Sequence, residues 1–139
     1  MRDKLFDRDN SVYIKQVEGK GRGLFAGVPF KAGDLIDRAP TWGFDYEAVN
    51  LLKQTGLLEF YFVRHNQRQG AELVAGYVVF GFMSIANHSL NPNAKTIWND
   101  GNVGAGASMM AVKDIKVDEE ITQRYNNIVD YPRTIKFIE

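Results

Sequence analysis

The chain has 139 residues, with 17 Lys and Arg against 17 Asp and Glu, two His and no Cys. A hydrophobic fraction of 45% beside 24% charged residues is ordinary globular composition and excludes a disordered chain. Non-specific nucleic-acid binding depends on excess positive charge, which this chain with zero net charge lacks. The lack of Cys excludes thiol catalysis, disulfides and Cys-ligated zinc. The length fits one domain, residues 1–139, and we expect no direct nucleic-acid partner.

Neither a targeting segment nor a membrane span is predicted. The first residues are charged and lack the apolar stretch of a signal peptide. The longest mainly apolar stretch, Leu73 to Ala86, contains two glycines and is shorter than the ~20 residues that a spanning helix needs. We therefore expect a cytoplasmic protein without a membrane partner.

The first half of the chain is predicted to hold short strands and one helix. Residues 12–15 alternate in polarity as a half-buried strand does, and residues 24–26 and 35–37 are short apolar pieces that follow turn signals. Asp45 is suited to cap a helix whose apolar residues recur at helical spacing, and Gly56 suits the position just past its end.

The second half is predicted to be mainly β. Residues 57–63 are apolar and aromatic, and a polar loop follows over 64–70. Residues 77–80 are β-branched and aromatic, which predicts a buried strand. Asp100-Gly101 is a hairpin signal, and residues 111–122 supply two further short apolar segments. The sequence thus predicts a mainly β domain of many short strands with one helix.

The first candidate functional segment is the glycine-rich run Gly19-Lys20-Gly21-Arg22-Gly23. It is not a dinucleotide fingerprint, because that motif opens a helix, and here residues 24–28 have strand chemistry and Pro29 follows. Two interpretations remain: a loop whose backbone approaches a ligand closely, or a tight turn between two strands.

A second candidate segment, residues 85–94, places three Asn, one His and one Ser directly after an apolar stretch. Buried amides and imidazoles need partners, so these side chains either tie the backbone together or face a ligand. A metal site is not predicted, because His65 is the only other His and no carboxylate lies at ligand spacing. A third segment, residues 112–125, is an acidic turn that leads to Tyr125; the acids read as a solvated turn and Tyr125 as a core-edge residue.

In this order, the three segments resemble the SET-domain family of protein-lysine methyltransferases, over about residues 11 to 131. The size, without zinc-binding flanking modules, is similar to the small stand-alone SET proteins of viruses and bacteria. The resemblance implies a SET β-clip fold of several short sheets, with a C-terminal pseudoknot and one short helix. The matching motifs are Gly21-Arg22-Gly23-Leu24-Phe25-Ala26, then Asn87-His88-Ser89 with Pro92-Asn93, then Lys113-Asp114-Ile115 with Glu119-Glu120-Ile121-Thr122 and Tyr125.

The resemblance also implies S-adenosylmethionine as the cofactor. The first motif contacts it through backbone, the Asn of the second holds its amino-acid end, and the following His meets the adenine through its backbone. Tyr125 matches the catalytic tyrosine of the family and also borders the cofactor. The implied cofactor-binding residues are Lys20, Gly21, Arg22, Gly23, Asn87, His88 and Tyr125.

A lysine channel lined by aromatic residues is implied as well, with Tyr61, Phe82 and Gln123 as its candidate wall. Gln123 stands two residues before Tyr125, where many members carry Phe or Tyr, so the number of methyl groups transferred is left open. The implied activity is methyl transfer to a lysine side chain of a protein substrate. The alternative is a catalytically silent SET-fold module that binds a peptide or protein, and homodimerisation is left open.

Overall fold

The structure is a computed structural model that describes residues 6–8, 11–56, 61–64, 68–69, 72–101 and 104–124. Residues 6–8, 68–69 and 72 are described by their backbone alone. All structural statements below concern this part of the chain.

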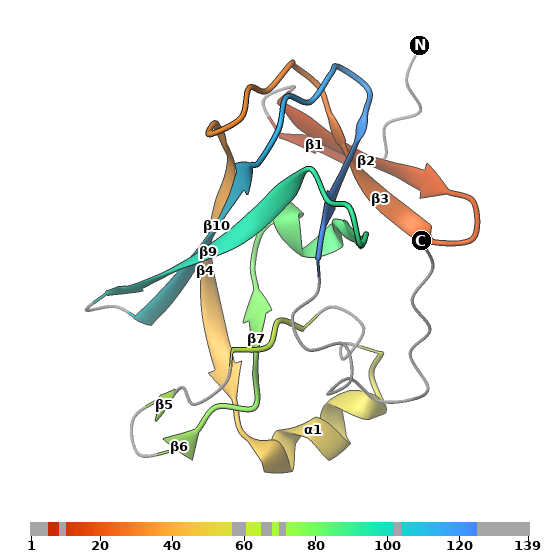
Figure 1. The fold of residues 1–139 in the computed structure, drawn as a ribbon. Helices are drawn as coiled ribbons and strands as arrows, with labels where there is room; N and C mark the ends of the chain where they lie inside the picture. Colours follow the sequence, from red (N-terminus) through yellow and green to blue (C-terminus); the bar gives the residue numbers. More distant parts are fainter. Residues whose placement is uncertain are drawn as a thin grey trace.

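Five strands form one sheet in the order β1-β2-β3-β11-β8 (Figure 1). The last of the described strands, β11, lies between β3 and β8; it pairs antiparallel with β3 and parallel with β8. Strands distant in sequence are therefore neighbours here. The bounds are β1 Phe6–Arg8, β2 Val12–Val17, β3 Gly21–Ala26, β8 Asn87–His88 and β11 Glu120–Gln123.

A second, antiparallel sheet has the order β7-β4-β10-β9, and β5 and β6 form a separate two-stranded pair. Figure 1 shows the two larger sheets side by side, with η2 near the middle of the molecule and α1 at the far end of β4. The bounds are β4 Leu35–Phe44, β5 Arg68–Gln69, β6 Glu72–Leu73, β7 Gly76–Val79, β9 Ala94–Gly101 and β10 Gly104–Ala111.

The predicted helix is α1, Tyr46–Lys53, and its N-terminal cap is confirmed. Asp45 has extended backbone, and its Oδ1 accepts a hydrogen bond of 2.9 Å from the Ala48 N–H. Such a cap satisfies one of the N–H groups that the first turn leaves without a helical partner. A 3₁₀ helix, η2, spans Phe82–Ile85 and leads directly into β8.

The main hydrophobic core draws residues from both larger sheets and from η2. Its fully buried side chains include Leu24 of β3, Met83 of η2, Met109 of β10 and Ile121 of β11. Because the glycine-rich strand, the segment before Asn87 and the last strand all contribute, the core fixes the relative positions of the three sequence motifs. None of the described helices is long and apolar enough to cross a membrane.

Two details of the strand prediction are wrong. Phe80, predicted to be buried, is 61% exposed, because successive side chains of an extended chain point to opposite faces and its neighbour Val79 faces the core. The predicted hairpin is formed by β9 and β10, but Gly101 and Gly104 are register partners, so Asp100-Gly101 ends β9 and does not form the turn.

Candidate functional site

The three motifs found in the sequence become three adjacent strands. Glu120 of β11 is the register partner of Phe25 in β3, and on the other side of β11 Thr122 is the partner of Asn87 in β8. The Ser89 N–H donates to the Gln123 carbonyl at 2.9 Å, which continues the contact beyond β8. The motifs therefore form one continuous structure, which we call the motif sheet (β3, β11 and β8).

Glycine is required at two positions of the first motif for different reasons. Gly21, where the turn enters β3, has a φ of +76°, a conformation that other L-residues rarely adopt. Gly23 is buried, and a Cβ atom there would lie 2.7 Å from Cγ2 of Val17, 2.8 Å from Oε2 of Glu120 and 3.1 Å from Nδ2 of Asn87. The missing side chain at Gly23 thus makes room for Glu120 and Asn87 to meet above β3.

Asn87 is the side chain that joins all three strands. Its Nδ2 donates to the carbonyl of Arg22 at 3.0 Å and to Oε2 of Glu120 at 2.8 Å. These two bonds occupy both amide N–H groups, and Oδ1 remains an acceptor to which no described residue donates. We call this group, formed by Gly23, Asn87 and Glu120, the cradle.

Asn93 fastens the loop after β8 to β11, which is the first of the two roles that the sequence allowed for the polar side chains of residues 85–94. Its Nδ2 donates to the Glu120 carbonyl at 2.9 Å, and its Oδ1 accepts from the Thr122 N–H at 2.9 Å. The residue is only 5% exposed. Both backbone groups depend on this side chain, because buried polar groups without partners are costly.

Replacing Asn93 with alanine is expected to destabilise the fold by about 2 kcal/mol, since two backbone groups of β11 lose their partner. The measurement is the free energy of unfolding in urea. Asn91→Ala is the matched control, because Asn91 is exposed and its side chain meets only Lys113 Nζ, at 3.3 Å, among the described residues. Equal stability of the two variants would contradict the role given to Asn93.

Gln123 lies at the inner end of the motif sheet and is 2% exposed. Its Oε1 accepts from the Thr96 hydroxyl at 2.7 Å, and its Nε2 donates to the Met83 carbonyl at 3.5 Å. The amide is therefore oriented by β9 on one side and η2 on the other. Phe82, another candidate channel residue, is half-buried in η2 and packs against the main core.

Tyr61, the third candidate channel residue, belongs to a different group of contacts from Gln123 and Phe82. It packs with Val63 in a small cluster that Phe44, Val49 and Leu52 complete, and no described contact joins it to Gln123. Its neighbour Phe62 instead faces the main core. Two residues named from the sequence lie outside the described residues: His65 and Tyr125.

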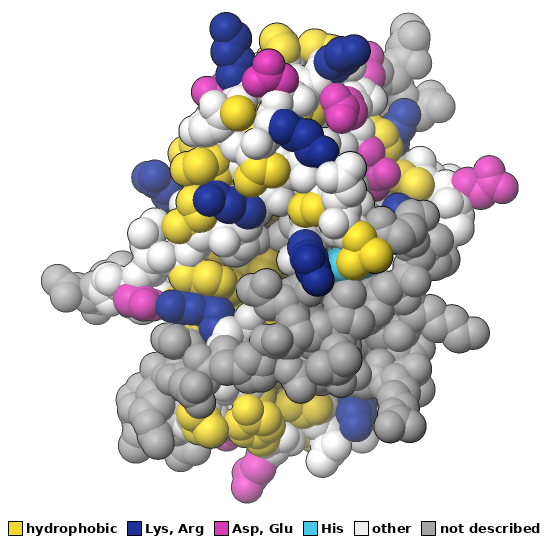
Figure 2. Space-filling model, viewed as in Figure 1, with side chains coloured by type: hydrophobic (Ala, Val, Ile, Leu, Met, Phe, Trp, Pro, Cys, Tyr) yellow, Lys and Arg dark blue, Asp and Glu magenta, His cyan; other side chains and the backbone are white. Residues whose placement is uncertain are grey.

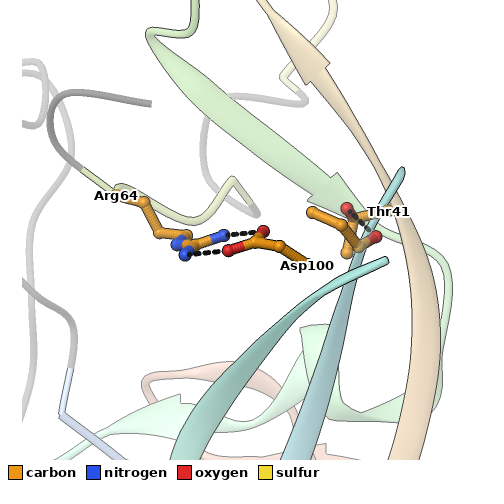
Figure 3. Close-up of polar contacts among 4 residues, drawn as sticks. Thr41, Arg64 and Asp100 are labelled. Carbon is orange, nitrogen blue, oxygen red and sulfur yellow. Dashed lines mark hydrogen bonds and ion pairs between the residues drawn. The ribbon is translucent and has the colours of Figure 1, made fainter. Parts of the chain in front are cut away.

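An ion pair holds the segment that carries Tyr61 against β9 (Figure 3). Arg64 makes two hydrogen bonds to the Asp100 carboxylate, at 2.9 and 3.1 Å, and its guanidinium lies 4.8 Å from the ring centre of Trp98. The hydrogen bond from Arg64 lowers the pKa of Asp100, and the same bond raises the pKa of Arg64. Burial raises the pKa of Tyr77, whose ring is the second aromatic neighbour of Arg64. Sequence reasoning missed this contact, since its partners come from different elements.

A cluster of metal-ligating side chains would indicate a metal site, and a patch of basic side chains would indicate a nucleic-acid site. No group of three or more metal-ligating side chains occurs among the described residues. On the face shown in Figure 2, the Lys and Arg side chains are spread among acidic and hydrophobic ones instead of forming one basic patch.

Comparison with known families decides the assignment. The family model of the SET domain matches residues 21–126, which include all three strands of the motif sheet. The chain belongs to the SET-domain family.

This SET domain is similar to one curated protein of Schizosaccharomyces pombe, a histone-lysine N-methyltransferase described as H3 lysine-37 specific, with 31% identity over 115 residues. The match covers 82% of this chain and 72% of that protein. A crystal structure of a Plasmodium falciparum protein described as a histone methyltransferase has a TM-score of 0.66 and 22% identity, with 85% of this chain and 95% of that chain covered.

A further solved structure, of a histone lysine methyltransferase studied for its product specificity, has a TM-score of 0.62 and 22% identity, with 84% of this chain and 50% of that chain covered. These two likenesses concern the fold. They confirm the predicted class of a mainly β SET domain with several short sheets and one helix. Residues after 124, which the predicted pseudoknot also involves, lie outside the described residues.

Proposed function

We propose that this SET domain, taken as a single domain over residues 1–139, transfers methyl groups from S-adenosylmethionine to lysine side chains of a protein substrate. Membership of the family and the name of the curated relative support the class of protein-lysine N-methyltransferase. The observation that carries the proposal is the cradle, in which Asn87 hydrogen-bonds to β3 and β11 above Gly23, whose missing Cβ leaves room for these side chains.

The cradle fits the proposed cofactor. A Cβ at position 23 would lie 2.7 to 3.1 Å from atoms of Val17, Glu120 and Asn87, so only a glycine allows these side chains to pack against the backbone of β3. Asn87 offers a free acceptor there, and the backbone around His88 is fixed by its pairing with Gln123. When bound, S-adenosylmethionine supplies a methyl group on a positively charged sulfur. We propose that Lys20, Gly21, Arg22, Gly23, Asn87 and His88 bind it.

The protein's task in this reaction is to deliver a neutral amine in the correct orientation. A lysine with a pKa of ~10.4 is neutral only about four times in ten thousand at pH 7, and only the neutral amine is a nucleophile. A dry channel lowers that pKa, because burial disfavours the charged ammonium form. We propose that Phe82 and Gln123 border this channel and that the Tyr125 hydroxyl orients the amine. The reaction then needs no strong general base, because the amine enters neutral and is held in the orientation for attack.

The first prediction concerns Asn87. Asn87→Ala removes a cradle acceptor and releases Glu120, so we expect the affinity for S-adenosylhomocysteine to fall about tenfold, the effect of ~1.4 kcal/mol. Isothermal titration calorimetry measures the affinity, and a melting curve confirms that the variant is folded. An unchanged dissociation constant in a folded variant would remove Asn87 from the cofactor site.

The second prediction concerns Gln123 and Thr96. If Gln123 borders the amine, its replacement by Phe changes the volume and hydrogen bonding around the amine, and the ratio of mono-, di- and trimethylated lysine should change. Thr96→Val should change that ratio in a milder way, because Thr96 only orients the Gln123 amide, at 2.7 Å. Mass spectrometry of the methylated peptide gives the ratios. Identical ratios in all three proteins would place Gln123 outside the channel.

The function itself is tested by incubating the protein with labelled S-adenosylmethionine and protein substrates, followed by mass spectrometry of modified lysines. Histone H3 is the first substrate to try, because the curated relative is described as specific for it, and a whole-cell lysate widens the search. Methylated lysine supports the enzyme. Cofactor binding without any methylated lysine would favour the silent binding module instead.

A further inference from the structure

Two neighbouring acids in the third motif have different surroundings. Glu119 is exposed and closes the turn before β11, since its Oε1 accepts from the Lys116 N–H at 2.9 Å. Glu120 is half-buried, and its Oε2 accepts from Asn87 Nδ2 at 2.8 Å. Only the first therefore behaves as the solvated turn residue that the sequence suggested for both.

The Glu120 carboxylate has no cationic partner among the described residues. Asn87 gives one hydrogen bond to Oε2, and no described residue donates to Oε1. A partly buried carboxylate is better stabilised by an opposite charge than by one neutral amide, because charge-assisted hydrogen bonds are the stronger ones. The Glu120 carboxylate, on the central strand of the motif sheet, is therefore not paired with a positive charge of any described residue.

The chemistry of the cradle restricts what it binds. Both N–H groups of Asn87 are used, so its remaining polar atom accepts hydrogen bonds, as does the free oxygen of Glu120. A group bound here must donate hydrogen bonds and carry positive charge. Of the charged groups of S-adenosylmethionine, only the α-ammonium does both, since its carboxylate is an anion and its sulfonium has no N–H or O–H.

We infer that Glu120 is a cofactor-binding residue whose carboxylate, held in place by Asn87, pairs with the α-ammonium group of S-adenosylmethionine. This assignment rests on the proposed function. It gives the buried glycine a specific purpose, because a Cβ at Gly23 would lie 2.8 Å from the Glu120 oxygen that Asn87 holds. It also separates the roles of the two acids: Glu119 shapes the turn and Glu120 supplies the charge.

The test compares two ligands by calorimetry. S-adenosylhomocysteine carries the α-ammonium without the sulfonium, and 5′-methylthioadenosine lacks the whole amino-acid end. Glu120→Gln keeps the size and the acceptor for Asn87 but removes the charge. We expect it to weaken S-adenosylhomocysteine binding about 10- to 100-fold and to leave 5′-methylthioadenosine binding unchanged. Glu119→Gln is the matched control, with both affinities near wild type.

The assignment would be overturned by an unchanged affinity of Glu120→Gln for S-adenosylhomocysteine, or by an equal loss for S-adenosylhomocysteine and 5′-methylthioadenosine, which indicates a structural role. A loss for S-adenosylmethionine without one for S-adenosylhomocysteine also overturns it, since the contact is then to the sulfonium. A wild-type chain that binds none of these ligands refutes the proposed function and the assignment together.

If Glu120→Gln does not fold, the assignment is tested by ligand affinities of the wild-type chain. The wild type should bind S-adenosylhomocysteine about tenfold or more tightly than the analogue that lacks only the α-amino group. Equal affinities for the two ligands would overturn the assignment.

Discussion

Gly23→Ala is expected to lower the affinity for S-adenosylhomocysteine about 100-fold, while the free energy of unfolding falls by only about 1 kcal/mol. The added Cβ would lie 2.7 Å from Val17 Cγ2, 2.8 Å from Glu120 Oε2 and 3.1 Å from Asn87 Nδ2, so all three side chains must move. The end of a Glu side chain moves at little cost to the fold. When the Glu120 carboxylate moves, it leaves its position in the cradle. A displacement of about 1 Å at a binding site is enough to lower an affinity 100-fold.

The matched control for this prediction is Gly106→Ala in β10. Gly106 is also a strand glycine, but a Cβ there would meet no atom closer than 3.7 Å. Calorimetry gives the affinities and urea unfolding gives the stabilities. Cofactor affinity should be unchanged in Gly106→Ala. If Gly23→Ala binds S-adenosylhomocysteine as tightly as wild type, the cradle is not the cofactor site.

Tyr125→Phe is expected to slow methyl transfer about 100- to 1000-fold, or roughly 3–4 kcal/mol of activation free energy. The substitution removes one hydroxyl and keeps the ring, so the fold should be preserved. Binding of cofactor and substrate should change far less, because the orienting contact matters most in the transition state. Single-turnover kinetics measures the rate, with calorimetry for cofactor affinity and a melting curve for the fold.

Arg124→Lys serves as the control for Tyr125→Phe, because Arg124 is the exposed residue directly before it and the change keeps the charge. Its transfer rate should stay close to wild type. A Tyr125→Phe variant that turns over at the wild-type rate would refute the catalytic role of Tyr125 and leave the cradle unaffected.

The features that sequence analysis predicted correctly are those encoded over a few residues. The helix cap is one, since Asp45 and the N–H that it binds are three residues apart. The glycine-rich run is another, because the tight turn that was one of its two interpretations places Gly19 and Gly21 at positive φ, a conformation that favours glycine. The strand containing Tyr77 was recognisable because its β-branched and aromatic residues suit a buried sheet. The strand containing Val12 was recognised from alternating polarity, although its first three residues are all buried.

The features that were missed depend on pairing between distant elements. Glu120 has the local pattern of a solvated turn, and only the register of β11 against β3 and β8 brings it to Asn87. Arg64 and Asp100 likewise give no sign in sequence that they form a two-fold hydrogen-bonded pair. Asp118, with a φ of +69° in a position that favours glycine, receives a hydrogen bond of 2.7 Å from the Tyr13 hydroxyl at the other end of the chain.

The order of strands in the motif sheet has a consequence for how the protein folds. β11 separates β3 from β8, so the β3–β11 pairing forms only after the chain has closed a loop over most of its length, whereas the β8–β11 pairing closes a much shorter loop. Closing a long loop lowers the chain's entropy before any stabilising contact forms. Domains dominated by pairings between distant strands therefore fold slowly, in milliseconds to seconds. During synthesis, β3 therefore has one unpaired edge until residues 120–123 have left the ribosome. Unpaired strand edges are sites where aggregation begins and where chaperones bind.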